Sequence, residues 1–201
     1  MFRNFIILAF FAANAAAQGG GGIQKMELIP FSRLRGQFQQ TKLIKELKLE
    51  LKSEGSFEIN RKNEQSIPTV YWNAVKPKLL AICIDELGMV VESGAGATKK
   101  KKTLQFSEVG KETGEQIGHF LRLLTLDQKR IGQEFTVFQK EDKFILDPKN
   151  KEKSFFEKAE IKVVKGLVHN LWIFEKSGDQ IYFEFSGHKI SDYQETPSCA
   201  R

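Results

Sequence analysis

The sequence predicts a mainly β protein with a helical lid, in which a strongly curved antiparallel sheet is covered on one side. Apolar and polar residues alternate over many short segments, which is typical of strands with one apolar and one solvated face. Turn-forming residues separate these segments at short intervals, as in antiparallel connections and not in crossovers. One stretch, residues 112–126, has the periodicity of a helix instead.

The alternation begins at Leu34 and recurs as far as Phe185. The run from Leu79 to Ile84 is apolar at every position, so that strand should be covered on both faces. A sandwich or a closed barrel would have the same number of strands, but the mid-chain helix favours a sheet closed on one side by a lid. We expect strands at 34–39, 47–52, 57–60, 70–75, 79–84, 89–92, 135–139, 144–146, 161–164, 167–174 and 181–185.

The helical stretch carries its apolar residues on one face. Ile117, Phe120, Leu121 and Leu124 fall at offsets of zero, three, four and seven residues. This spacing is typical of an amphipathic helix that rests one side on an apolar surface. The sequence therefore predicts that this helix is the lid of the sheet.

The N-terminus has the pattern of a secretory signal peptide over residues 1–17. Arg3 precedes an apolar run too short for a membrane anchor, and Ala15, Ala16 and Ala17 offer a cleavage site. The glycine-rich residues 18–22 predict a flexible leader. The length of 201 residues favours one domain, which would occupy residues 23–201.

The composition excludes several classes of protein. No apolar run approaches the ~18–20 residues of a transmembrane helix. Cleavage after Ala17 would remove Arg3 and lower the net charge from +6 to +5, a modest excess that argues against a nucleic-acid partner. Phe is abundant, at 17 of 201 residues, and supplies apolar area without polar atoms.

In an oxidising compartment Cys83 and Cys199 could form a disulfide, or Cys83 could be a buried thiol and Cys199 a free one.

The sequence contains none of the patterns of an active site. The three histidines are not spaced as a metal pair, and no nucleophile elbow occurs. The segment Gly94–Lys99 lacks the glycine that precedes the lysine of a phosphate-binding loop. The run Lys99–Lys102 is either a solvated loop or an electrostatic docking site for an acidic partner or anionic lipid. We therefore expect neither enzymatic activity nor a cofactor or metal.

Several short segments together resemble the outer-membrane lipoprotein carrier (LolA) family. They follow the family's order along the predicted mature chain: LRGQFQQ (34–40), GSFEINR (55–61), WNAVKP (72–77), DELG (85–88), FILDPK (144–149) and the hairpin of residues 171–185. The resemblance implies an incomplete antiparallel barrel with an apolar concave cavity, closed by short α-helices. It also implies that Arg61, six residues after Gly55, helps to hold the lid shut.

Family membership would make this chain a monomeric periplasmic carrier. It would bind the acyl chains of lipoproteins and ferry them from an inner-membrane exporter to an outer-membrane acceptor. Two other roles fit the same resemblance: a paralogue that carries another lipid or apolar metabolite, and a periplasmic module that senses mislocalised lipoproteins. The residues expected to line the cavity or lid are Leu34, Phe38, Leu49, Phe57, Ile59, Arg61, Trp72, Leu80, Ile82, Ile84, Leu121, Leu124 and Trp172.

Overall fold

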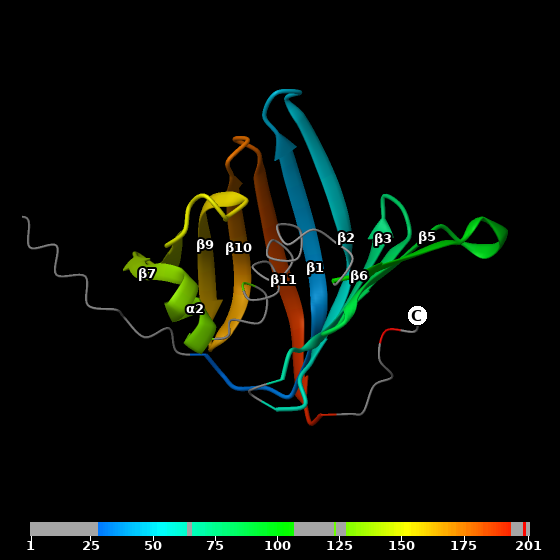
Figure 1. The fold of residues 1–201 in the computed structure, drawn as a ribbon, viewed down its shortest axis with the longest axis horizontal. Helices are drawn as coiled ribbons and strands as arrows, with labels where there is room; N and C mark the ends of the chain where they lie inside the picture. The colour runs from blue at the N-terminus through cyan, green and yellow to red at the C-terminus, as the bar shows by residue number, and fades with distance from the viewer. Residues whose placement is uncertain (1–27, 64–65, 107–122, 124–127, 194–198, 200–201) are drawn as a thin grey trace, which may run out of the picture.

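The computed structural model describes residues 28–63, 66–106, 123, 128–193 and 199 (Figure 1). Eleven strands form one antiparallel sheet in the order β6-β5-β4-β3-β2-β1-β11-β10-β9-β8-β7. The strands are β1 (Arg33–Ile44), β2 (Leu49–Asn60), β3 (Thr69–Lys76), β4 (Leu80–Ile84), β5 (Gly88–Ser93), β6 (Lys100–Gln105), β7 (Phe135–Lys140), β8 (Lys143–Pro148), β9 (Phe156–Val164), β10 (Leu167–Glu175) and β11 (Gln180–Ser191).

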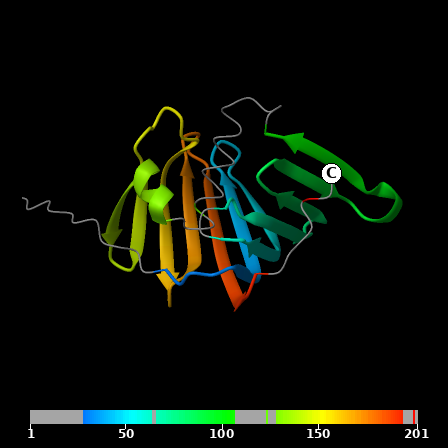
Figure 2. The ribbon, with the colours of Figure 1, turned by 60° about the horizontal axis from the view of Figure 1, so that its bottom comes forward.

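The sheet consists of two meanders that meet at its centre. Strands β1–β6 form one and β7–β11 the other, and antiparallel pairing of β1 with β11 joins them. Figure 2 shows how strongly the sheet curves, yet the outermost strands β6 and β7 do not pair, so no barrel closes. The prediction of a mainly β, strongly curved, open antiparallel sheet is therefore confirmed.

Two predicted strands belong to one longer strand, and one strand was missed. The segments 47–52 and 57–60 join in β2, while Leu47 and Lys48 lie in the turn before it. The lysine run expected in a loop or docking site instead enters the edge strand β6 at Lys100. Consecutive lysines have no apolar alternation to mark a strand, but on an exposed edge their charges discourage pairing with another chain.

Helix accounts for little of the described chain. The short helix α2 (Gln128–Glu134) leads directly into β7 and lies over β7–β9 (Figure 1), with Ile131 buried. Seven residues, one of them Gly132, are too few for a clear amphipathic pattern, so the sequence did not predict α2. A 3-10 turn, η1 (Gly96–Thr98), lies between β5 and β6. Of the predicted lid, only Leu123 is described, as a buried helical residue.

The remaining predictions for the N-terminus and the lid lie outside the described residues. They are the signal peptide 1–17, the leader 18–22, and the lid positions Ile117, Phe120, Leu121 and Leu124.

On the convex side of the sheet, Cys199 near the C-terminus of the chain contacts the end of β4. Cys83 forms a disulfide with Cys199, with 5.6 Å between the two Cα atoms. The Asp85 carboxylate follows β4 and accepts hydrogen bonds from the N–H groups of Leu87, Gly88 and Cys199. Val90, beside Cys83 on β5, is buried. These contacts provide convex-side cover at Cys83. Leu79, which the sequence places in the same covered run, lies just before β4 and is 47% exposed, so the prediction of cover on both faces is wrong at that residue.

Candidate functional site

Five aromatic rings from four adjacent strands form a continuous cluster on the concave face of the sheet. They are Phe38, Phe57, Trp72, Phe183 and Phe185. The Phe38 and Trp72 rings stack with their centroids 3.8 Å apart, and Trp72 meets Phe183 edge-on at 5.7 Å. Phe57 meets Phe185 edge-on at 5.4 Å. This aromatic cluster is the centre of the apolar core.

The alternation of the strands places these rings on one face. Phe57 pairs with Trp72 across β2 and β3, and also with Gly36 across β2 and β1. A Cβ atom on Gly36 would lie 2.7 Å from the Phe57 ring, so only glycine leaves room for that ring to lie across β1. A residue without a side chain is thus a structural requirement of the aromatic cluster.

The helix α2 lies over the concave side of the sheet at β7–β9 (Figure 1). Phe135 and Phe156 stack there at 5.8 Å, and both are fully buried. Ile131 of α2 and Leu123 belong to the same apolar core. A helix therefore packs on the concave side of the sheet at strands β7–β9. This agrees with the prediction that one side of the sheet is covered.

Polar residues border the aromatic cluster toward the β1–β2 turn. Along β1 the same face continues from Phe38 to Gln40, whose side-chain oxygen accepts a hydrogen bond of 3.2 Å from Ser53. Next comes Lys42, which is 3.0 Å from Glu175 and 3.7 Å from Asp179. The apolar surface therefore ends in satisfied polar groups at this side.

A pair of histidines borders the cluster at the opposite side. An irregularity in the pairing of β1 with β11 places Gly36 opposite both Gly187 and His188. The His188 ring lies 6.2 Å from the Phe57 ring and 4.8 Å from the ring of His169. Burial lowers the pKa of His188, the neighbouring His169 lowers it further, and a hydrogen bond to the Val168 backbone opposes both effects.

Eight of the thirteen predicted cavity and lid residues lie in or against the apolar core, and two lie outside the described residues. Leu34, Phe38, Phe57, Ile59, Trp72 and Ile84 are buried together in one core cluster, and half-buried Leu80 and Ile82 pack against it. Leu121 and Leu124 lie outside the described residues. The sequence reasoning did not single out Phe183 and Phe185, although their alternation in β11 marks them as sharing a face.

Arg61 lies just beyond β2, at the same end of the sheet as the histidine pair. Its backbone N–H donates a 2.7 Å hydrogen bond to the carbonyl of Ser32. Its guanidinium carbon lies 5.8 Å from the centre of the Phe31 ring. These contacts hold Arg61 against the segment that leads into β1. The lid that it was expected to hold lies outside the described residues apart from Leu123, so its role at the lid stays a prediction.

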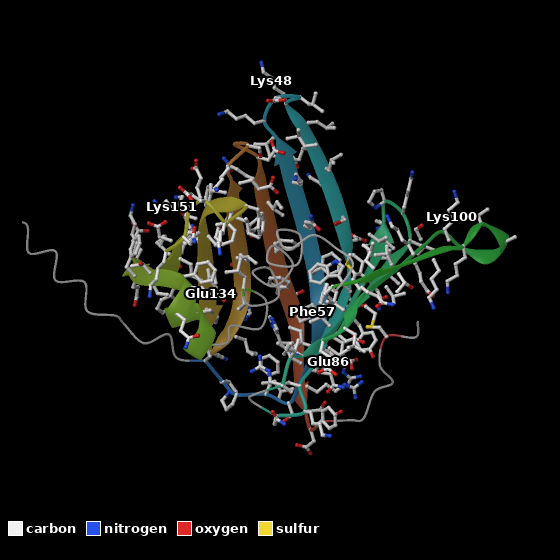
Figure 3. The ribbon with its side chains drawn as sticks, viewed as in Figure 1. Lys48, Phe57, Glu86, Lys100, Glu134 and Lys151 are labelled. Atoms are coloured by element: carbon white, nitrogen blue, oxygen red, sulfur yellow. A yellow bond between two sulfur atoms is a disulfide. The ribbon has the colours of Figure 1, made fainter. Side chains whose placement is uncertain are left out.

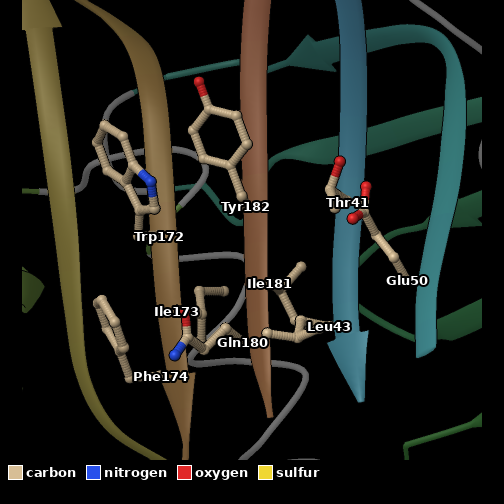
Figure 4. A pocket seen from close by; sticks show the side chains of 9 residues that line it. All are labelled: Thr41, Leu43, Glu50, Trp172, Ile173, Phe174, Gln180, Ile181 and Tyr182. Carbon is tan, nitrogen blue, oxygen red and sulfur yellow. The ribbon is translucent and has the colours of Figure 1, made fainter. Parts of the chain in front are cut away.

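Two residues expected in the cavity do not belong to the aromatic cluster. Leu49 is on the concave face by its alternation in β2. It lies near the turn of the β1–β2 hairpin, which protrudes past the neighbouring strands, and its side chain is 44% exposed. Trp172 lies on the convex face, because its neighbours Leu171 and Ile173 take the concave side of β10. There it lines a shallow pocket of about 250 Å³ together with Thr41, Leu43, Phe174 and Tyr182 (Figure 4).

The described part of the chain contains neither a cluster of metal-binding side chains nor a membrane-spanning helix. Among these residues no group of three or more His, Cys, Asp or Glu side chains could hold a metal ion. None of the described helices has the length and apolar character needed to cross a membrane.

The site belongs to the class of mainly β proteins built on one open, curved antiparallel sheet, with aromatic residues on its concave side and a helix over strands β7–β9. Comparison with known families identifies this one: the sequence matches the family model "Outer membrane lipoprotein carrier protein LolA" over residues 31–195. The chain belongs to the LolA family, whose members are periplasmic carrier proteins and not enzymes. No curated protein sequence matches the chain.

Comparison with solved structures finds similar proteins of low sequence identity. A DUF1329 family protein from Desulfovibrio piger is 9% identical and has a TM-score of 0.43, with 80% of this chain and 86% of that chain covered. A putative outer membrane lipoprotein-sorting protein domain from Vibrio parahaemolyticus is 6% identical, with a TM-score of 0.41 and coverage of 84% and 89%. A LolA superfamily protein from Nitrosomonas europaea is 10% identical, with a TM-score of 0.36 and coverage of 84% and 90%.

Proposed function

We propose that this chain is a periplasmic carrier that binds the acyl chains of lipoproteins against its concave face and ferries them from an inner-membrane exporter to the outer membrane. The observation that carries the proposal is the aromatic cluster on the concave side of an open sheet, whose rings are buried in the apolar core and would have to be uncovered to receive an acyl chain. Exposing an acyl chain to water costs about 0.8 kcal/mol of free energy for each CH₂ group. A carrier must therefore offer an apolar surface about as large as the surface of the acyl chain. Phenylalanine rings provide such area without leaving polar atoms unpaired.

The disulfide supports the proposed compartment. Bonds such as Cys83–Cys199 form and persist in oxidising compartments, among them the bacterial periplasm. In the proposal, residues 1–17 are the signal peptide that directs export, and residues 23–201 act as a single monomeric domain. The exporter and the acceptor are the membrane partners that the family assignment suggests.

Photocrosslinking from matched positions on the two faces tests where the acyl chain lies. A benzophenone amino acid replaces Ile82, a half-buried residue that packs against the concave core, or Phe138, a 42% exposed residue of β7. Phe138 pairs with Ile145, whose neighbours Phe144 and Leu146 pack in the concave core, so Phe138 serves as the convex control. The two proteins are expressed in a bacterial envelope with a triacylated lipoprotein and are irradiated.

The proposal expects a lipoprotein adduct from position 82 and none from position 138. Mass spectrometry of the adduct then establishes whether the acyl chain or the protein part of the cargo is attached. Equal crosslinking from both faces would contradict binding on the concave face. An adduct at position 82 that contains only a free lipid would favour the paralogue that carries another apolar molecule.

A further inference from the structure

We infer that one rim of the sheet is a docking surface for an anionic phospholipid bilayer. The antiparallel order brings five strand connections to the same end: residues 45–48, 77–79, 94–99, 149–155 and 176–179. We call these five connections the basic rim. They contain eight lysines against the three carboxylates of Glu46, Glu152 and Asp179. The lysine-rich start of β6 adjoins the same end.

The connections at the opposite end of the sheet have a slight excess of negative charge among the described residues. Its connections between consecutive strands, at 61–68, 85–87, 141–142 and 165–166, contain three cations and four carboxylates among the described residues. The five basic-rim connections alone have a surplus of five positive charges, whereas the whole chain has a net charge of +6. The positive charge is therefore concentrated at one end, as Figure 3 illustrates with Lys48 and Lys151 on that side and Glu86 at the other.

Exposed apolar side chains gather at the same end. Leu47, at the turn of the protruding β1–β2 hairpin, is 69% exposed, and its neighbours Leu43, Leu49 and Leu51 are exposed as well. Leu79 and Val75 add a second exposed apolar site at the β3–β4 turn. Half of the twelve large exposed apolar residues among the described residues thus lie on these two hairpins.

This combination fits a bilayer surface better than an acidic protein. Each lysine near an anionic leaflet contributes about 1 kcal/mol, and leucines beside lysines can enter the boundary between headgroups and acyl chains. The basic rim is an arc of separate loops along one end of the sheet, so it suits a broad charged surface. The contact would be weak and reversible, as a protein that must leave the membrane again requires.

Vesicle binding tests the inference separately from the proposed function. The purified chain is mixed with vesicles of neutral phosphatidylcholine or of phosphatidylcholine containing phosphatidylglycerol, and the bound fraction is measured by sedimentation. We expect binding to the anionic vesicles alone. Binding should weaken from about 0.1 M to about 1 M salt, as the Debye length shortens from about 10 to about 3 Å.

A triple variant and a matched control test the position of the surface. Lys48→Glu, Lys78→Glu and Lys151→Glu place charge reversals on three basic-rim loops, at exposed side chains. Lys62→Glu, Lys165→Glu and Lys189→Glu change the net charge equally at exposed positions toward the other end. The basic-rim variant should lose at least about tenfold in partition coefficient, while the control keeps most of it.

Three outcomes would overturn the inference. They are equal losses in the two triple variants, equal binding to neutral and anionic vesicles, and no binding of the unmodified chain at low salt. Circular dichroism verifies that each variant is folded. Because none of these measurements involves a lipoprotein, crosslinking from position 82 can succeed while vesicle binding fails, and the reverse.

Discussion

The chain has two tryptophans, and the sheet places them on opposite faces. Trp72 on β3 is 9% exposed and contacts the rings of Phe38, Phe183 and Phe185. Trp172 on β10 lies beside Tyr182 at 5.1 Å, with the Lys143 ammonium 3.9 Å from its ring centre. The same residue type is a core residue in one strand and a partly solvated platform for a cation in the other.

The difference between the two tryptophans shows that the position of a residue in the in-and-out alternation of its strand decides whether its side chain reaches the concave face. In β3, Val70, Trp72 and Ala74 alternate inward. In β10 the inward positions are Leu171 and Ile173, so Trp172 must point outward. A large aromatic residue is evidence for a concave binding face only after its register is known.

Replacing each tryptophan by alanine should give the largest difference in stability between the two faces. Trp72→Ala removes the centre of the aromatic cluster and should lower the free energy of unfolding by about 3–5 kcal/mol, as for other buried aromatic residues. Trp172→Ala removes a half-buried ring and its cation contact and should cost about 1 kcal/mol. Urea denaturation followed by circular dichroism measures both values.

Equal losses of stability in the two variants would contradict the assignment of the faces. A second measurement separates the binding role from stability. Lipoprotein adducts from position 82 should decrease in the Trp72→Leu background and stay unchanged in the Trp172→Leu background. Unchanged adducts in both backgrounds would remove Trp72 from the binding surface.

The disulfide should have the next largest effect, because it is the covalent tie on the convex side. Cys83 and Cys199 are separated by 116 positions, and closing so long a loop restricts the unfolded chain. Replacing both by Ala should lower the free energy of unfolding by about 2–4 kcal/mol. Urea denaturation of the unmodified chain with dithiothreitol is the control, and it should approach the midpoint of the variant. A midpoint that the reductant leaves unchanged would argue against the bond.

The sequence was sufficient for the fold because most strands have a clear period of two. It failed where that signal is absent or interrupted. Lys100–Lys102 form part of β6 without any alternation, since an edge strand can be polar on both faces. The prediction left residues 53–56 between segments 47–52 and 57–60, although pairing with β1 continues through all four residues.

The site was predictable only in part. Residues such as Phe38, Phe57 and Trp72 follow from alternation together with the family resemblance. The side to which Trp172 points depends on which neighbours are buried, and local hydrophobicity cannot provide that information. The His169–His188 pair depends on irregular pairing in β10 and β11, which leaves no distinct sequence signal.

A smaller effect is expected from the cation above Trp172. Lys143 also donates a 3.3 Å hydrogen bond to Glu160, which accepts another from Lys158. Burial raises the pKa of Glu160, but these hydrogen bonds outweigh it and hold the pKa below its usual value. Lys143→Met should cost about 0.5–1 kcal/mol and raise the pKa of Glu160, measured by urea denaturation and by NMR titration. The equivalent change at Lys189 is the control and should alter neither quantity.

The smallest expected effect is a dependence of stability on pH from the histidine pair beside the aromatic cluster. The pKa of His188 is lowered from its ordinary value of 6.5 by burial and by His169. The unfolded chain therefore binds the proton first as the pH falls. This contribution to stability is complete above about pH 6.5 and is lost as the pH falls toward the lower pKa of the folded state.

His188→Gln should flatten that part of the pH profile, and His169→Gln should reduce its slope, because the second ring then no longer repels a charged His188. Urea midpoints measured between about pH 7.5 and about pH 5 give the profile, with the slope set by the difference in bound protons. The effect stays small because His188 is only half-buried, so solvent still screens the charged ring. If the profile of His188→Gln matches that of the unmodified chain, other groups cause the pH dependence. The concave border would then differ from the convex face in shape and hydrophobicity but not in its response to protons.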